Sequence, residues 1–317
     1  MRYSDLDILF LTKEIPDYIH DAVHLGLCQL GCNVLDYPDK PSLHGTKSPK
    51  FHSDQLLFNL PRVKLRKKAD LMIVTSLAYD YNPMGTDKWK KSVVEAEIIF
   101  EPARTVALDG SDKVETILPL LKRDYSCVFK REMFKKPSEG WHPMQFAAIQ
   151  EPYLYRYYDT RDLDFTYMAA PSCDFRSKVA HYLRAFSEKH GMKSIVFCGA
   201  PTLARSTYLD NLSRSRCSVS VQGMGYSCYR YFEIPAKGTV MVAQDVGIPF
   251  DNDFDDTMCY KFKDLDQLGE ILLRVRDTPN DVLEGMAMKA QAHYLLYHTP
   301  KRRAAEMLSV IYPGISP

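Results

Sequence analysis

The stretch GMGYSCYRYFE, residues 223–233, brings together side chains that could bind an anion. Gly223 and Gly225 would let the backbone approach a ligand closely. Arg230 could pair with a phosphate or with Glu233 itself, and Glu233 could accept hydrogen bonds from two vicinal hydroxyls. The stretch follows the apolar run CSVSV and leads into a helix, whose first N–H groups favour phosphate. It therefore predicts a site for a phosphorylated and hydroxylated ligand, although a G-x-G pattern also occurs in ordinary turns.

Two further cations are placed where they could help to hold such a ligand. Arg176 and Lys178 stand near the start of a predicted helix, directly after the apolar run at residues 163–170. Cations at this position oppose the helix dipole, so their placement favours a nearby anion. The alternative is an ordinary pair of surface side chains.

In the first half of the chain, candidate residues follow a predicted strand. The sequence DGSD, at residues 109–112, ends that strand, and either Asp109 or Asp112 could act as the general base for an acceptor hydroxyl. The same four residues are also typical of turns and caps. Lys130 and Arg131, in FKRE, could bind an acceptor phosphate or brace the DGSD turn through ion pairs.

Alternating apolar runs and amphipathic segments would position these residues. This alternation is typical of doubly wound α/β domains with parallel sheets. The expected strands are residues 6–12, 32–38, 69–76, 103–112, 163–170, 194–200, 217–223 and 239–245. The expected helices are residues 17–30, 176–191, 206–216, 229–238, 264–278 and 300–312.

The length and a change in composition indicate two domains. A chain of 317 residues exceeds one typical core. Residues 135–152 are rich in proline, glycine and aromatic side chains without clear periodicity. We therefore expect an N-terminal domain at 1–145, a second domain at 146–298, and a C-terminal helix and tail at 299–317.

Composition narrows the possible partners and the compartment. The 41 Lys and Arg residues nearly balance 40 Asp and Glu residues, which argues against a broad nucleic-acid surface. The basic cluster RVKLRKK, residues 62–68, and the lysines of DKWKK, near Tyr79, Tyr81 and Trp89, leave local DNA contact open. Eight cysteines without a C-x-x-C pair indicate reduced thiols and no zinc site. Because no long apolar run suggests a transmembrane segment or signal peptide, we expect a cytoplasmic protein.

Residues 213–250 resemble the nucleotide-sugar site of GT-B glycosyltransferases. The shared pattern is small-x-x-G-x-G…Y-R-x-x-E, followed by a strand and turn with G-x6-D, and it is similar to the group related to spore-maturation and exostosin-like transferases. That group includes small bacterial and phage members. The segments ALDGSD, VFKRE and HYLLYHTPKRRAAEML resemble further parts of it.

This resemblance implies two Rossmann-like domains facing a central cleft, with the C-terminal helix crossing back to the first domain. It implies transfer of a sugar from a nucleotide-sugar, with a UDP-sugar as the leading expectation, to a glycan or to a hydroxymethylated base of DNA. No metal and no other cofactor are expected. The alternative is a non-catalytic protein that binds a nucleotide-sugar or sugar phosphate. The donor-binding residues would be Gly223, Gly225, Tyr229, Arg230, Glu233, Arg176 and Lys178.

One position departs from the family pattern. Many retaining members carry a second glutamate eight residues before the ribose-binding one, and here 233 − 8 = 225 is Gly225. Retention or inversion at the anomeric carbon is therefore left open.

Overall fold

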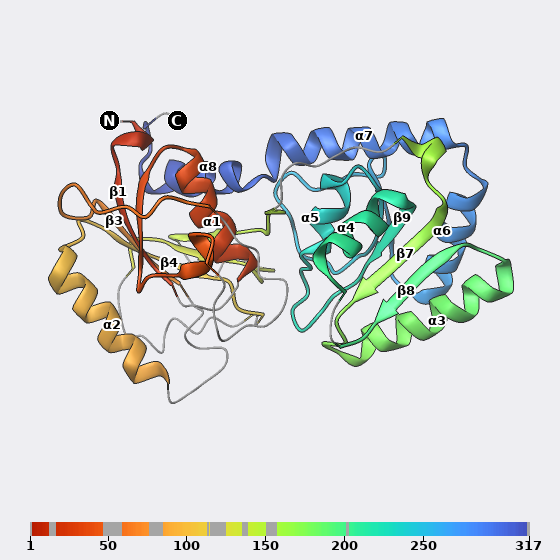
Figure 1. Ribbon diagram of the computed structural model, residues 1–317, viewed down its shortest axis with the longest axis horizontal. Helices are drawn as coiled ribbons and strands as arrows, with labels where there is room; N and C mark the ends of the chain where they lie inside the picture. The colour runs from red at the N-terminus through yellow and green to blue at the C-terminus, as the bar shows by residue number, and fades with distance from the viewer. Residues whose placement is uncertain are drawn as a thin grey trace. The chain divides into compact units, whose positions relative to one another are not determined.

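The computed structural model describes residues 2–12, 17–46, 59–75, 85–112, 114, 125–134, 139–149, 157–200 and 203–315, without the side chains of residues 85–90 (Figure 1). The chain forms two compact units. Unit 1 comprises Met1–Ile149 and Thr299–Pro317, and unit 2 comprises Gln150–His298. Both units contain a parallel sheet with helices, which confirms the predicted fold class.

The sheet of unit 1 has the strand order β2-β1-β3-β4-β5-β6, and every pairing is parallel. All five residues of β1 and of β3 are buried, as expected for central strands covered on both faces. On one face, the side chains of α2 pack against alternate residues of β1 and β3. The bounds are β1 Asp7–Leu11, β2 Asn33–Tyr37, β3 Leu71–Thr75, β4 Thr105–Asp109, β5 Val128–Lys130, β6 Trp141–Pro143, α1 Tyr18–Gln29, α2 Gly85–Phe100 and α8 Pro300–Ile311.

Helices α1 and α8 pack against each other at very short range (Figure 1). A Cβ atom added to Gly26 would lie 2.0 Å from the carbonyl oxygen of Pro300 and 2.8 Å from the Cβ of Ala304. Glycine is therefore required at this crossing, since any side chain would push the two backbones apart. Helix α8 is thus an integral part of unit 1, although all of unit 2 precedes it in the sequence.

Unit 2 has the strand order β11-β10-β9-β7-β8, again with parallel pairings only. Its core is formed by inward side chains of β7, β9 and β10 and by apolar faces of α3 and α6. Helix α3 ends at Gly191, which adopts a left-handed conformation with φ of 62°. The bounds are β7 Leu163–Ala169, β8 Ser194–Cys198, β9 Ser215–Ser220, β10 Val240–Gln244, β11 Cys259–Phe262, α3 Asp174–His190, α4 Arg205–Arg214, α5 Arg230–Ala236, α6 Leu265–Asp277 and α7 Asn280–Tyr297.

Two buried histidines of α1 make the stability of unit 1 depend on pH. Burial lowers the pKa of His20, and it lowers the pKa of His24 to about 4; Asp36, Lys40 and His44 are the charged groups nearest to His24. The unfolded chain binds protons to these histidines below about pH 6.5, whereas the folded protein does not. Stability conferred by the neutral rings is therefore complete above pH 6.5 and is lost as the pH falls toward 4.

We expect His24→Leu to remove part of this acid sensitivity. Urea unfolding of the wild-type protein should show a loss of up to about 3 kcal/mol from His24 between pH 6.5 and 4. The variant should lose measurably less over the same interval. His181→Leu, at an exposed position on α3, is the matched control and should leave the slope unchanged. Equal slopes for the wild-type protein and His24→Leu would contradict the prediction.

Candidate functional site

The loop that follows β9 lies at the carboxyl edge of the unit 2 sheet. The backbone N–H of Gln222 donates to Oε1 of Gln244 at the end of β10, over 3.1 Å, and the N–H of Gly223 donates to the carbonyl of Gly225, over 2.9 Å. A small pocket beside the loop is lined by Gln222 and Gln244 together with Tyr226, Tyr231 and Phe250. Open α/β sheets bind their ligands at this edge.

Arg176, on α3, fixes the position of this loop by a hydrogen bond. Its Nε donates to the carbonyl of Gln222 over 2.9 Å, and its Nη1 donates to the carbonyl of Ala170 over 3.2 Å. A Cβ on Gly223 would lie 2.7 Å from Nη2 of Arg176. A side chain at this position would therefore displace the guanidinium, and the φ of Gly223 is not positive. Lys178 is exposed on α3.

Glu233 is buried and already has two partners from α4. The Tyr208 hydroxyl donates to Oε2 of Glu233 over 2.9 Å, and the Arg205 guanidinium pairs with Oε1. Burial and the neighbouring carboxylate raise the pKa of Tyr208 well above its usual value, so the phenol remains a hydrogen-bond donor. The sequence suggested an ion pair between Glu233 and Arg230, but the structure places Arg205 on the carboxylate. In the sequence, Arg205 is distinguished only by its position directly before the helix predicted at residues 206–216.

Arg230, which is half-buried, has guanidinium nitrogen atoms that lack hydrogen-bond partners. Its Nε and Nη2 atoms are shielded from solvent and make no hydrogen bond. Tyr167, Tyr208, Cys228 and Glu233 are the titratable groups around it. Arg230, Arg205 and Arg176 carry three positive charges against the single carboxylate of Glu233, leaving 3 − 1 = 2 in excess.

The helix that begins at Arg230 contributes little to this charge. Helix α5 has only seven residues and contains Pro235, so its dipole is short. The phosphate-binding capacity expected from the helix start therefore depends on the guanidinium of Arg230. Tyr229, which immediately precedes the helix, is buried beside Arg205.

In unit 1, Asp109 is fully buried at the end of β4. Its Oδ1 accepts a hydrogen bond from the N–H of Ser111 over 3.0 Å, and its Oδ2 lies 3.6 Å from Nζ of Lys130. Burial lowers the pKa of Lys130, and the carboxylate of Asp109 counteracts this effect. In this arrangement Asp109 holds the turn, as in the alternative interpretation of DGSD.

Asp112 is the accessible aspartate of the same turn. Its side chain is 37% exposed and pairs with the Arg131 guanidinium. The Nε atom of Arg131 also lies 3.0 Å from Oε1 of Glu132, and the guanidinium stacks over the ring of Phe146. Both cations that the sequence offered for an acceptor phosphate therefore already have carboxylate partners, as in the bracing alternative.

Comparison with known proteins identifies this architecture. Residues 176–309 match the glycosyl transferase-like family. An alpha-glucosyltransferase solved with UDP and a 13-mer DNA superposes with a TM-score of 0.66 at 11% identity, over 96% of this chain and 98% of that chain. The fold is GT-B. This confirms the fold that the sequence resemblance implied.

Two other GT-B structures match along nearly the whole chain. Sucrose-phosphate synthase from Thermosynechococcus elongatus gives a TM-score of 0.62 at 11% identity, over 96% of this chain and 98% of that chain. HepE from Anabaena, in complex with UDP and glucose, gives 0.57 at 10% identity, over 96% and 99%. No curated protein matches the sequence significantly.

The basic cluster of this GT-B chain is largely neutralised. In RVKLRKK four of the five cations form ion pairs, which leaves little free charge for a phosphate backbone. Tyr79 and Tyr81, and the side chains of Lys88, Trp89 and Lys90, lie outside the described residues. The ion pairs are Arg62–Asp39, Arg66–Asp7, Lys67–Asp70 and Lys68–Glu101.

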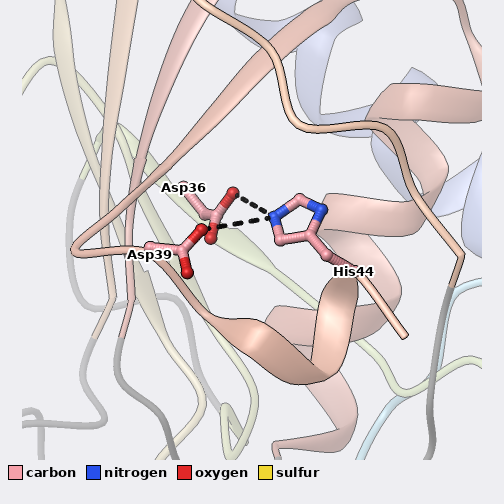
Figure 2. A group of neighbouring side chains, drawn as sticks. All are labelled: Asp36, Asp39 and His44. Carbon is pink, nitrogen blue, oxygen red and sulfur yellow. Dashed lines mark hydrogen bonds and ion pairs between the residues drawn. The ribbon is translucent and has the colours of Figure 1, made fainter. Parts of the chain in front are cut away.

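Within the described part of the chain, one group of carboxylates and histidine is close enough to share a metal ion, and it lies in unit 1. Figure 2 shows Asp36 and Asp39 beside His44, whose Nε2 is 3.0 Å from Oδ1 of Asp36. The Nδ1 atom of His44 lies 2.8 Å from the carbonyl oxygen of Leu60, and Asp39 pairs with Arg62. These groups satisfy one another as hydrogen-bond and ion-pair partners.

No described helix combines the length and hydropathy that a membrane crossing requires.

Proposed function

We propose that the protein is a glycosyltransferase that moves a sugar from a nucleotide-diphosphate sugar, with a UDP-sugar as the leading candidate, to an acceptor hydroxyl. The glycosyl transferase-like match over unit 2 and the GT-B fold support this class of reaction. The observation that carries the proposal is the guanidinium of Arg230 beside the loop after β9, whose Nε and Nη2 atoms are buried and make no hydrogen bond. The three arginines and Glu233 have a net charge of +2, which balances the charge of −2 on a sugar-linked diphosphate at neutral pH.

Each donor-site residue then has a chemical role. Arg230 binds the diphosphate and stabilises the negative charge that develops as the bond from the sugar to the phosphate oxygen breaks. Arg176 positions the loop by holding the carbonyl of Gln222. Glu233 accepts hydrogen bonds from the ribose hydroxyls after Arg205 moves from its carboxylate toward the phosphates. Because guanidinium groups supply this charge, the proposed transfer requires no metal ion.

The nature of the donor is tested by thermal shift and slow donor hydrolysis with UDP-, GDP-, ADP-, dTDP- and CMP-sugars, each with and without EDTA. We expect one nucleotide class, UDP, to raise the melting temperature and its sugar to be released despite EDTA. No shift with any donor would refute the proposal. Turnover that EDTA abolishes would refute metal independence alone.

Asp112 is the proposed general base, because it is the exposed carboxylate of the DGSD turn. We expect Asp112→Asn to lower the rate of transfer by roughly 10²- to 10⁴-fold while UDP affinity stays unchanged. Asp109→Asn should instead lower the melting temperature, because it weakens the turn and leaves Lys130 without its buried counter-charge. The measurements are steady-state transfer, UDP titration calorimetry and thermal unfolding. Full activity of Asp112→Asn would exclude it as the base.

A non-catalytic binding protein is the second candidate. The burial of Asp109 and the glycine at position 225 favour it, since both remove carboxylates that could serve turnover. UDP-sugar binding without hydrolysis or transfer to any acceptor would support this alternative. In both cases Glu233→Ala is expected to weaken donor binding.

A further inference from the structure

Helix α2 carries apolar side chains on the face that is turned away from the sheet. Its other face packs on β1 and β3, and Figure 1 shows the helix at the outer margin of unit 1. Val94, Ile98 and Ile99 are 50%, 72% and 60% exposed. Because Val94 and Ile98 are four residues apart, they are neighbours on the helix surface. Together the three side chains form an apolar patch, which is typical of an interaction surface.

The charges along α2 are arranged against its helix dipole. The first half of the helix holds three lysines and one aspartate, whereas the second half and the residue that follows it hold three glutamates. Cations near the N-terminus and anions near the C-terminus are each unfavourable in an isolated helix. A second α2 helix running in the opposite direction would present the opposite charge at each end. The charged residues are Asp87, Lys88, Lys90, Lys91, Glu95, Glu97 and Glu101.

Glu101 places a carboxylate at a position where glycine is usual. It directly follows the end of α2 and has a φ of 41°, in the left-handed region. Its ion pair with Lys68 is exposed on both sides, as is the pair of Lys91 with Glu95, over 3.9 Å. Exposed ion pairs contribute little to stability. Helix termination and this ion pair are therefore weak reasons for a carboxylate at position 101, whereas a contact with a second chain would be a stronger one.

We propose that α2 forms the contact between two copies of this chain, packed antiparallel about a twofold axis level with Ala96. In this arrangement Val94 lies level with Ile98 of the second copy, and Lys91 lies level with Glu101 of the second copy. Each apolar contact and each ion pair occurs twice, as an isologous interface requires. The inference concerns assembly of the chain and does not depend on the proposed donor site.

A second copy fits this face better than an anionic membrane surface does. Helices that lie on membranes carry lysine and arginine around their apolar face. Here Glu95 and Glu101 lie three residues before and three residues after Ile98, so carboxylates flank the apolar patch. A single pair of helices buries less surface than a standard interface. We therefore expect a weak dimer with a dissociation constant of roughly 1 to 100 µM.

Sedimentation equilibrium of the full chain at concentrations from about 1 to about 200 µM tests the assembly. We expect the mean mass to rise from that of one chain toward that of two. Ile98→Glu should raise the dissociation constant at least about 100-fold, because two apolar contacts are lost in each dimer. Its melting temperature should not fall, since the side chain is exposed in the single chain. Leu296→Glu, at a 58% exposed position of α7, is the matched control and should associate like the wild-type protein.

A charge exchange tests the pairing itself. Lys91→Glu and Glu101→Lys should each raise the dissociation constant about tenfold, because like charges then oppose each other. The double variant should restore wild-type association. A wild-type chain that is monomeric at every concentration would overturn the proposal. Effects of the single variants that the double variant does not reverse, or binding of a monomeric wild-type chain to phosphatidylglycerol vesicles through Ile98, would overturn it as well.

Discussion

Replacing Arg230 by methionine is expected to weaken the binding of UDP and UDP-sugars by roughly 100-fold. The Nε and Nη2 atoms of its guanidinium are buried and have no acceptor, so a diphosphate would be their partner. Losing one side of a buried charge pair costs about 3 kcal/mol, which corresponds to this loss of affinity. Isothermal titration of the purified variant with UDP measures the effect directly.

The free Arg230→Met protein should remain folded, because Glu233 keeps Arg205 and Tyr208 as partners. Arg214→Met removes a cation from an exposed ion pair with Asp162 at the end of α4 and serves as the control. Its UDP affinity should equal that of the wild-type protein. Wild-type affinity in a folded Arg230→Met variant would show that the diphosphate binds elsewhere.

A second large effect is expected from Gly26→Ala. The added Cβ would lie 2.0 Å from the carbonyl oxygen of Pro300, so α1 and α8 must separate. Both helices are packed through buried side chains, and forced separation of such a contact typically costs about 3 kcal/mol. We expect a lower urea midpoint and faster proteolysis within α8.

Gly285→Ala provides the matched control. Gly285 also lies within a helix, α7, but no atom is within 4 Å of its added Cβ. Alanine at this position should be neutral or stabilising by up to about 1 kcal/mol, because it favours the helix. Equal destabilisation by the two substitutions would mean that the α1–α8 contact is not the cause.

The central strands were predictable because they are buried on both faces. The apolar runs at residues 6–12 and 69–76 contain β1 and β3, whose burial is continuous. Short strands lacked such a signal: β5 and β6 have three residues each, and β11 has four residues, of which the middle two are half-exposed. Helix α7 was missed because apolar side chains such as Leu295 and Leu296 are exposed on it and obscure its periodicity.

The candidate site was predictable in position but only partly in its contacts. The loop at residues 223–233 could be identified from its residue types, and it lies at the carboxyl edge of β9 and β10. The partner of Glu233 could not, since Arg205 is 28 residues away in the sequence and reaches it only through the packing of α4. Likewise, the burial of Asp109 depends on β5 lying beside β4, and a strand of three residues is too short to be recognised as an apolar run in the sequence.

The close contact of α1 with α8 also has a consequence for protein synthesis. A ribosome makes the described strands of unit 1 first, then all of unit 2, and only afterwards the helix that covers α1. Domains generally fold as units during translation, starting from the N-terminus. In this protein the second unit can complete its fold before the first. Unit 2 is one continuous segment, whereas the apolar face of α1 stays uncovered until α8 has been synthesised. Nascent chains stalled before residue 299 should therefore contain a folded second unit and a first unit that binds chaperones.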